Sequence, residues 1–227
     1  ALAQGRKLLV RVDRVEPSKN ILRGLQAYEL FLRRHPEWHN RIVFANLLYP
    51  SRLELAEYRD LKREIEELSH AINREHGSLE WDPVYLDIED NYPRSVAALR
   101  EYDVLLVNPV VDGMNLVSKE GAVLNERDGV IILSVGAGAY QELRNAVIPV
   151  NPLDISETAD AVHRALALGE RKRKAMAKAA RETVQANTSF RWFLQQMRAL
   201  RLVERQRAAG RAGDEPVVEL PRYERFD

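Results

Sequence analysis

Short runs of aliphatic residues recur along the chain, and the longer stretches between them place apolar side chains three or four residues apart. The short runs are rich in Val, Ile and Leu, which is typical of strands buried on both faces of a parallel sheet. Six strands are therefore predicted, over Lys7–Val12, Arg41–Leu47, Pro83–Ile88, Asp103–Val107, Gly129–Ser134 and Ala146–Val150.

The longer stretches have the period of amphipathic helices. Their apolar positions are Ile21, Leu25, Tyr28 and Leu32, then Tyr58, Leu61, Ile65, Leu68 and Ile72, and later Ile155, Ala159, Val162 and Leu166. Asp154 or Ser156 is a candidate N-cap for the third of these helices. Beyond Leu168 the chain is rich in Ala, Lys and Arg, and two further helices are predicted over Arg171–Ala186 and Ser189–Arg207.

Strands that alternate with helices indicate an α/β fold, with a doubly wound, parallel, six-stranded Rossmann-like sheet followed by C-terminal helices. We assign this domain to residues 1–206, and the Gly, Pro and charge content beyond it predicts an extended tail over 207–227. In the common strand order 3-2-1-4-5-6, the first and fourth strands are neighbours at the topological switch point. Ligands bind there, beyond the carboxyl ends of the strands.

Composition excludes several classes of function. The 227-residue sequence has 34 Lys and Arg against 34 Asp and Glu, and this balance argues against a surface built for nucleic acid or an anionic membrane. The sequence contains no cysteine, so disulfides, a thiolate nucleophile and a thiolate zinc site are excluded, which suits the cytoplasm. No window approaches the roughly 18 consecutive apolar residues of a spanning helix.

The first residues, Ala1–Gly5, have no Met and no cationic run leading into an apolar one. They are therefore unlike a secretory signal. A strand pattern follows directly, so we expect the chain to begin at a domain boundary.

The segment after the first strand carries two cations at the start of a helix. Arg14 and Lys19 flank Pro17, which stops the strand, and Ser18, which can cap the helix. A guanidinium fork, an ammonium and the free N–H groups of a helix N-terminus together suit a diphosphate. The alternative, which the spacing leaves open, is a pair of solvated surface cations.

The segment after the fourth strand contains an Asp-Gly turn, Asp112-Gly113, that opens a helix. Gly113 is free to adopt a positive φ, and such a turn exposes backbone N–H groups to phosphate or sugar oxygens. Glu120 lies one or two turns into the helix, within reach of two ribose hydroxyls. The alternative is a structural turn capped by Asn115 or Ser118, with Glu120 exposed.

A third segment, Ser134–Ala139, follows the fifth strand and contains Gly136 and Gly138. A dinucleotide fingerprint should follow the first strand and end in a third glycine, where this chain has Gln141. We therefore reject NAD binding. We expect a close turn near the ligand, with Glu142 as a polar contact.

Arg14 and Lys19, separated by four residues after the first strand, and the segment Asp112–Glu120 after the fourth together resemble the trehalose-6-phosphate synthase family (family 20). These are retaining glycosyltransferases with two facing Rossmann-like domains, the GT-B fold. The likeness runs from about Lys7 to Leu200, and it falls on the C-terminal, donor-binding half.

The resemblance implies a role for each matching residue. Arg14 and Lys19 match the pair that holds the nucleotide diphosphate and stabilises the departing phosphate, and Asp112 matches the carboxylate that receives donor-sugar hydroxyls. Glu120 matches the ribose-binding carboxylate, and Arg52 matches an arginine that contacts the acceptor phosphate. The residues that match backbone contacts to the donor sugar and phosphate are Gly113, Met114, Asn115, Leu116 and Val117.

The resemblance also implies transfer of a glucosyl unit from a UDP-, GDP- or ADP-linked sugar to a sugar phosphate, with retention, no covalent enzyme nucleophile, no cofactor and no obligatory metal. The implied partner is an N-terminal Rossmann-like domain, which nothing in this sequence matches. We therefore expect binding without efficient turnover by this chain alone. Nucleic acid and membrane are not expected partners, and a homo-oligomer stays open.

Two alternatives stay open beside this one. Val15–Asn20 replaces the family's Leu-Asp-Tyr-Ser-Lys-Gly, which leaves room for a pseudo-glycosyltransferase that couples cyclitols into a validoxylamine-type phosphate. The second alternative is a non-catalytic module that binds a nucleotide sugar.

Other polar clusters favour structural interpretations. His35 and His39 are four residues apart, but Pro36 lies between them at the end of a helix, which favours a solvated helix terminus over a metal pair. The basic run Arg171–Lys174 has no interleaved aromatic residues and indicates a solvated helix face.

Overall fold

The computed structural model describes residue 3 and residues 5–210. The chain forms two compact units, Ala1–Val184 and Gln185–Asp227. The predicted domain of residues 1–206 therefore spans the first unit and part of the second.

The first unit is built on one sheet of six parallel strands in the order β3-β2-β1-β4-β5-β6, as predicted. The strands are β1 Lys7–Arg14, β2 Ile42–Tyr49, β3 Val84–Ile88, β4 Val104–Val107, β5 Val130–Ser134 and β6 Ile148–Val150. Each predicted strand is present, with ends shifted by at most two residues because the aliphatic runs are the segments that both helical layers bury.

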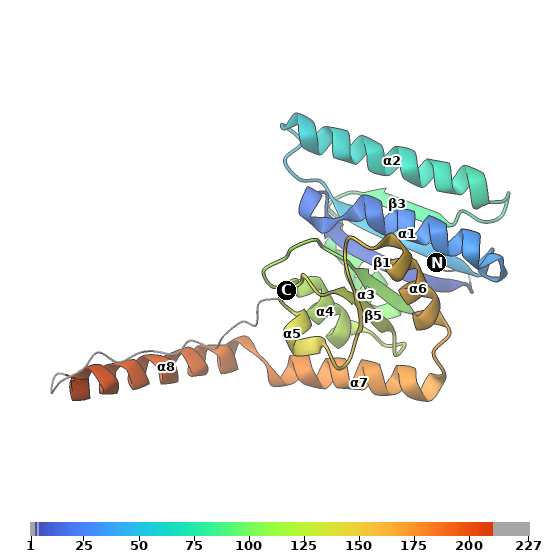
Figure 1. The fold of residues 1–227 in the computed structure, drawn as a ribbon. Helices are drawn as coiled ribbons and strands as arrows, with labels where there is room; N and C mark the ends of the chain where they lie inside the picture. The colour runs from blue at the N-terminus through green and yellow to red at the C-terminus, as the bar shows by residue number, and fades with distance from the viewer. Residues whose placement is uncertain (1–2, 4, 211–227) are drawn as a thin grey trace. The chain divides into compact units, whose positions relative to one another are not determined.

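Helices cover both faces of this sheet (Figure 1). The α-helices are α1 Ile21–Arg34, α2 Ala56–His76, α3 Tyr92–Glu101, α4 Leu116–Leu124, α5 Tyr140–Leu143, α6 Ile155–Leu166, α7 Glu170–Ala186 and α8 Ser189–Gly210; Pro17–Lys19 (η1) and Pro36–Trp38 (η2) are short 3₁₀ turns. Helices α1, α2 and α6 supply the core on one face, and α3, α4, α5 and α7 supply it on the other.

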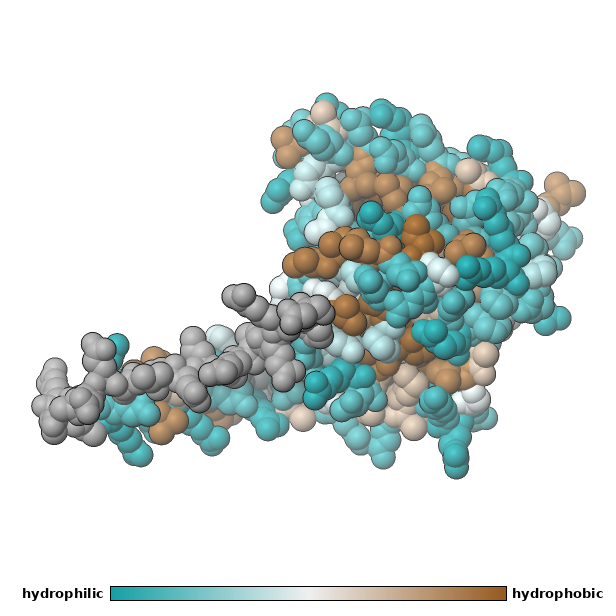
Figure 2. Space-filling model, viewed as in Figure 1, coloured by the Kyte–Doolittle hydropathy of each residue, from teal (hydrophilic) through white to brown (hydrophobic). Residues whose placement is uncertain are grey.

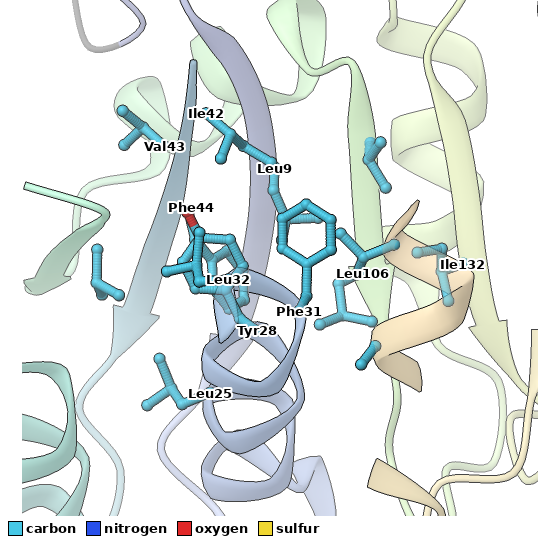
Figure 3. Packing of buried hydrophobic residues seen from close by; sticks show 14 of the residues in the cluster. Leu9, Leu25, Tyr28, Phe31, Leu32, Ile42, Val43, Phe44, Leu106 and Ile132 are labelled. Carbon is cyan, nitrogen blue, oxygen red and sulfur yellow. The ribbon is translucent and has the colours of Figure 1, made fainter. Parts of the chain in front are cut away.

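Strand alternation assigns each side chain to one of these two cores. On the α1 face, Tyr28, Phe31 and Leu32 pack over Leu9 and Phe44 (Figure 3). Successive residues of a strand point to opposite faces, so the next β1 side chain on the α1 face after Leu9 is the one at position 11. That position holds an arginine that is fully buried.

Helix α3 was not predicted. Its buried side chains, Ser95, Ala98 and Leu99, are mostly small, so its apolar period is weak. The start signal is nevertheless present in the sequence, because Asn91 caps the helix by accepting a hydrogen bond from the Arg94 amide (3.1 Å) and Pro93 occupies the first turn.

The second unit contains α8, which continues to Gly210. Residues 207–210, predicted as the start of an extended tail, are therefore helical, and residues 211–227 lie outside the described residues. Several large apolar side chains of α8 are exposed, among them Phe190, Phe193, Met197 and Leu200. Within the described residues, none of the helices combines the length and apolar character that crossing a bilayer requires.

Candidate functional site

The loops that follow β1 and β4 meet at the carboxyl edge of the sheet, as the strand order predicts. The Val110 amide, after β4, donates to the Ser18 carbonyl, after β1, at 2.9 Å. The Asn20 side-chain amide donates to the carbonyls of Asn108 (3.0 Å) and Pro152 (2.7 Å). Three segments far apart in sequence are thereby tied together at the switch point.

The loop after β1 contains a separate turn before its helix. Asp13 and Arg14 end the strand, and Pro17–Lys19 forms the 3₁₀ turn η1 because a proline at its first positions sets the backbone for a turn. Ser18 therefore lies inside that turn, and the prediction that it caps α1 is wrong. Asn20, with a left-handed backbone (φ 60°), is the residue from which α1 begins.

The loop after β4 also turns at an asparagine. Asn115 has φ 64° and caps α4, since its side-chain oxygen accepts from the Ser118 amide at 2.9 Å. The expectation of a positive φ at Gly113 is wrong, because Gly5 is the only glycine of the described residues with one. Asparagine tolerates this conformation because its short polar side chain bonds locally.

The loop after β5 supports this turn through its backbone. The Gly138 amide donates to the Asp112 carbonyl (2.9 Å), and the Asp112 amide donates to the Gly136 carbonyl (3.2 Å). A side chain on Gly138 would lie 2.1 Å from the Gly113 carbonyl oxygen, so only glycine permits the approach. Glu142 pairs with Lys119 (2.8 Å).

A cavity of about 400 Å³ lies between these loops and α3. Eight of the predicted residues line it: Arg14, Lys19, Asp112, Met114, Asn115, Leu116, Val117 and Glu120. The lining also contains residues that sequence reasoning did not assign: Val12, Asp13, Tyr49, Tyr92, Ser95, Val96 and Leu99. Four of these come from α3, the helix that the sequence did not reveal.

An ion pair joins the two predicted loops inside the cavity. Lys19 Nζ lies 2.5 Å from Asp112 Oδ2, and the two side chains are only 14% and 16% exposed. Asn115 Nδ2 donates to the same carboxylate at 3.1 Å. Burial alone would raise the pKa of Asp112, but the hydrogen bonds from Lys19 and Asn115 outweigh it and lower that pKa. Asp112 is therefore an ionised acceptor at neutral pH.

Asp13 is a second carboxylate in the lining. Its environment differs, because burial raises its pKa to about 6 while the nearby Arg11 and Lys19 charges oppose the shift. Arg11 Nη1 lies 3.7 Å from Asp13 Oδ2. The only signal for Asp13 in the sequence is a carboxylate at a strand end beside Arg14, which is too common to single out.

The two remaining predicted cations are more open to solvent. The Arg14 side chain is 62% exposed and lies 3.2 Å from the Glu16 carboxylate. Arg52 has φ 45° and donates to Tyr58 Oη at 3.3 Å, with its guanidinium 5.7 Å from the centre of that ring. Arg52 is not among the residues that line the cavity.

The histidines form a different pair from the one that the spacing suggested. His39 lies with Nε2 3.0 Å from the Leu32 carbonyl, whereas His35 stacks on His163 of α6 with ring centres 3.8 Å apart. Their ring planes are 4° from parallel, so the two rings stack face to face, and His35 Nδ1 also lies 3.0 Å from Glu37 Oε1.

The chain is similar to the members of one protein family. The model of glycosyltransferase family 20 matches residues 1–201. The bifunctional trehalose-6-phosphate synthase/phosphatase of Thermoproteus tenax is 40% identical over 189 residues, which are 82% of this chain and 26% of that protein. The UDP-forming α,α-trehalose-phosphate synthase A of Dictyostelium discoideum is 35% identical over 193 residues, 84% of this chain and 26% of that protein.

Solved structures extend the similarity to the whole sheet. The trehalose-phosphate synthase of Burkholderia xenovorans in complex with glucose-6-phosphate has a TM-score of 0.83 at 32% identity, covering 88% of this chain and 44% of that one. The Escherichia coli protein bound with UDP-2-fluoro glucose has a TM-score of 0.82 at 30% identity, covering 88% and 45%. The chain thus spans less than half the length of these relatives, and it matches the C-terminal half of the family. The sequence is a member of glycosyltransferase family 20.

Proposed function

We propose that this chain is the donor-binding half of a retaining glycosyltransferase that forms trehalose 6-phosphate from a UDP-linked glucose and glucose 6-phosphate. The observation that carries the proposal is the Lys19–Asp112 pair, which brings the two family segments into one cavity at 2.5 Å. The relatives named above are trehalose-phosphate synthases, two of them UDP-forming, and they do not favour the cyclitol-coupling or binding-only alternatives.

The cavity has a region for each part of a nucleotide sugar. Apolar surface for a base comes from Tyr92, Leu99 and Val117. The Glu120 carboxylate can accept hydrogen bonds from two ribose hydroxyls. Lys19 and Arg14 offer an ammonium and a guanidinium to the diphosphate. The Lys19–Asp112 pair holds both groups in place before ligand arrives, so little reorganisation is needed on binding.

The residues act mainly on the leaving group. As the bond between the anomeric carbon and the diphosphate breaks, negative charge grows on the phosphate oxygen, and Lys19 and Arg14 stabilise it. Asp112 accepts hydrogen bonds from hydroxyls of the donor sugar. These bonds fix the face of the ring that the acceptor approaches. The acceptor oxygen attacks from the face that the diphosphate leaves, and the departing phosphate takes its proton. This order of events retains the anomeric configuration without an enzyme nucleophile.

We propose that a partner domain supplies most of the binding site for the acceptor sugar phosphate. Arg52 lies outside the cavity lining and turns to Tyr58, so the described residues offer the sugar phosphate a single candidate cation on an exposed loop. Helix α8 carries exposed apolar side chains, and Figure 2 shows hydrophobic residues among hydrophilic ones along it. We propose that an N-terminal Rossmann-like half supplies the other wall of the site and covers this helix.

Calorimetric titration with UDP, GDP and ADP tests the proposal. UDP should bind most tightly, and Arg14→Ala with Lys19→Ala should weaken it by about 3–6 kcal/mol, since each charge-assisted hydrogen bond contributes roughly 1.5–3 kcal/mol. Lys62→Ala with Arg63→Ala is the matched control, because it removes the same two charge types from α2. Two results would contradict the proposal. The first is absence of UDP binding by the parent chain, and the second is equal UDP binding by the parent chain and the variant that lacks Arg14 and Lys19.

A further inference from the structure

A buried arginine lies directly beneath the loop that carries Lys19. Arg11 lies in the middle of β1 and is 0% exposed. Burial lowers the pKa of its guanidinium, and the nearby Asp13 charge opposes this shift. Burying a guanidinium is costly unless it is paired and hydrogen-bonded. Its nearest carboxylate is Asp13 at 3.7 Å, and its one hydrogen bond runs from Nη1 to the Lys19 carbonyl at 3.1 Å.

The fold makes room for this side chain. Gly24 on α1 faces it, and a Cβ at that position would lie 2.7 Å from Arg11 Nη2 and 3.3 Å from Asn108 Oδ1. A glycine inside a helix is intrinsically unfavourable, so its presence opposite the guanidinium indicates that the helix packing is adapted to the Arg11 side chain. Nε and Nη2 of Arg11 and the amide of Asn108 are buried without a hydrogen-bond partner in the protein. Buried polar groups without a hydrogen-bond partner are rare in native proteins, and they are expected chiefly at functional sites.

Arg11 holds one end of Lys19 while the cavity holds the other. The Lys19 carbonyl accepts from Arg11, and the Lys19 ammonium reaches Asp112 at 2.5 Å. Lys19 ends the η1 turn, and the next residue, Asn20, is fixed to the carbonyls of Asn108 and Pro152. The direction in which the ammonium enters the cavity therefore depends on anchors below the turn.

We infer that Arg11 is a positioning residue for the diphosphate site, which fixes the Lys19 carbonyl and so aims the Lys19 ammonium at the ligand. This inference rests on the proposed function. Arg11 also sets a positive charge beside Asp13, whose carboxylate lines the same cavity and would otherwise repel a diphosphate. Arg11 is not itself a lining residue of the cavity, so it acts on the ligand only through these two neighbours.

Two variants test the inference by different routes. Arg11→Met removes the guanidinium, and Gly24→Ala leaves it in the sequence but displaces it by the added Cβ. Each should weaken UDP binding about tenfold, the equivalent of one hydrogen bond to a charged group, while uridine binding changes less than about twofold. Arg11→Lys should restore part of the loss. Arg63→Met, on the exposed face of α2, is the control that should bind as the parent chain does.

The comparison of UDP with uridine separates positioning from general damage. A merely structural role would weaken both ligands together, whereas a role at the diphosphate weakens UDP alone. Urea denaturation of Arg11→Met and Gly24→Ala checks that both variants are folded under the conditions of the binding assay. If the parent chain binds UDP and Lys19→Ala abolishes this binding, but Arg11→Met and Gly24→Ala both bind UDP normally, the inference is wrong and the proposed function stands. If the parent chain does not bind UDP, both fail.

Discussion

Two cation–carboxylate pairs take their cations from β1 and the turn that follows it, and they hold their charges in different ways. In the Lys19–Asp112 pair the atoms are 2.5 Å apart, and the carboxylate also accepts from Asn115. In the Arg11–Asp13 pair the atoms are 3.7 Å apart, and the side chains are 0% and 4% exposed. The first pair lowers the pKa of its carboxyl group, and the second leaves the pKa of Asp13 raised to about 6.

The difference teaches that proximity of a cation does not by itself keep a buried carboxylate ionised. Direct donors compensate Asp112 for the water that it loses, whereas Asp13 loses more water and gains only Coulombic attraction across a longer gap. The pair that opens on the cavity keeps donors on Lys19 and acceptor sites on Asp112 for a ligand. The pair beneath it is a fixed support.

The pH dependence of stability gives the largest expected separation of the two pairs. Asp13 has a folded-state pKa of about 6, above the ordinary value of 3.8, so the folded state holds its proton more tightly than the unfolded state. Stability from this group is therefore present at low pH and lost as pH rises through 6. Relative to Asp13→Asn, the parent chain should lose about 2 kcal/mol between pH 4 and pH 7. Urea denaturation across that range measures it.

Parallel profiles of the parent chain and Asp13→Asn would mean that the Asp13 carboxyl is not perturbed by burial. Glu64→Gln on α2 is a matched control, because it also converts a carboxyl group to an amide but at an exposed position. Its profile should follow that of the parent.

Breaking the upper pair should have a smaller effect with the opposite dependence on pH. Lys19→Met removes the donor that lowers the pKa of Asp112, and we expect a cost of about 1–2 kcal/mol at pH 7. The contribution of a depressed carboxyl pKa is present above the unfolded value of 3.8 and lost as pH falls through the lower folded value. The parent and Lys19→Met should therefore converge in stability as pH falls below the lowered pKa of Asp112. A constant difference at all pH values would contradict the ion pair.

Sequence patterns were sufficient for the sheet and for the meeting of two loops. Aliphatic runs such as Leu8–Val10 are buried because both layers cover them, and the strand order follows from connections that prefer one hand. Once β1 and β4 are neighbours, Lys19 and Asp112 must share an edge of the sheet. These predictions needed only local composition and a general rule of topology.

Contacts that depend on three-dimensional packing could not be predicted in the same way. Arg11 interrupts an apolar run, and nothing local indicates that Gly24, one helix away, makes room for it. Tyr92 and Ser95 were missed with α3, whose small buried residues give a weak period. Arg52 matches a family position, yet its loop turns it to Tyr58, a contact that only the fold decides.

The smallest expected effect concerns the left-handed backbone of Asn115, the residue that supplies the second donor to the upper pair. Asn115 combines a left-handed backbone (φ 64°), the cap of α4 and a hydrogen bond to Asp112. Asn115→Gly keeps the backbone free of strain and should lose only a few tenths of a kcal/mol of stability from the cap. Asn115→Ala loses the same bonds and adds the left-handed penalty, so it should cost about 1 kcal/mol more. Thermal unfolding of the two variants side by side isolates that backbone term. Equal melting temperatures would show that the turn relaxes out of the left-handed region, and Asp112 would then be held by Lys19 without help from a fixed turn.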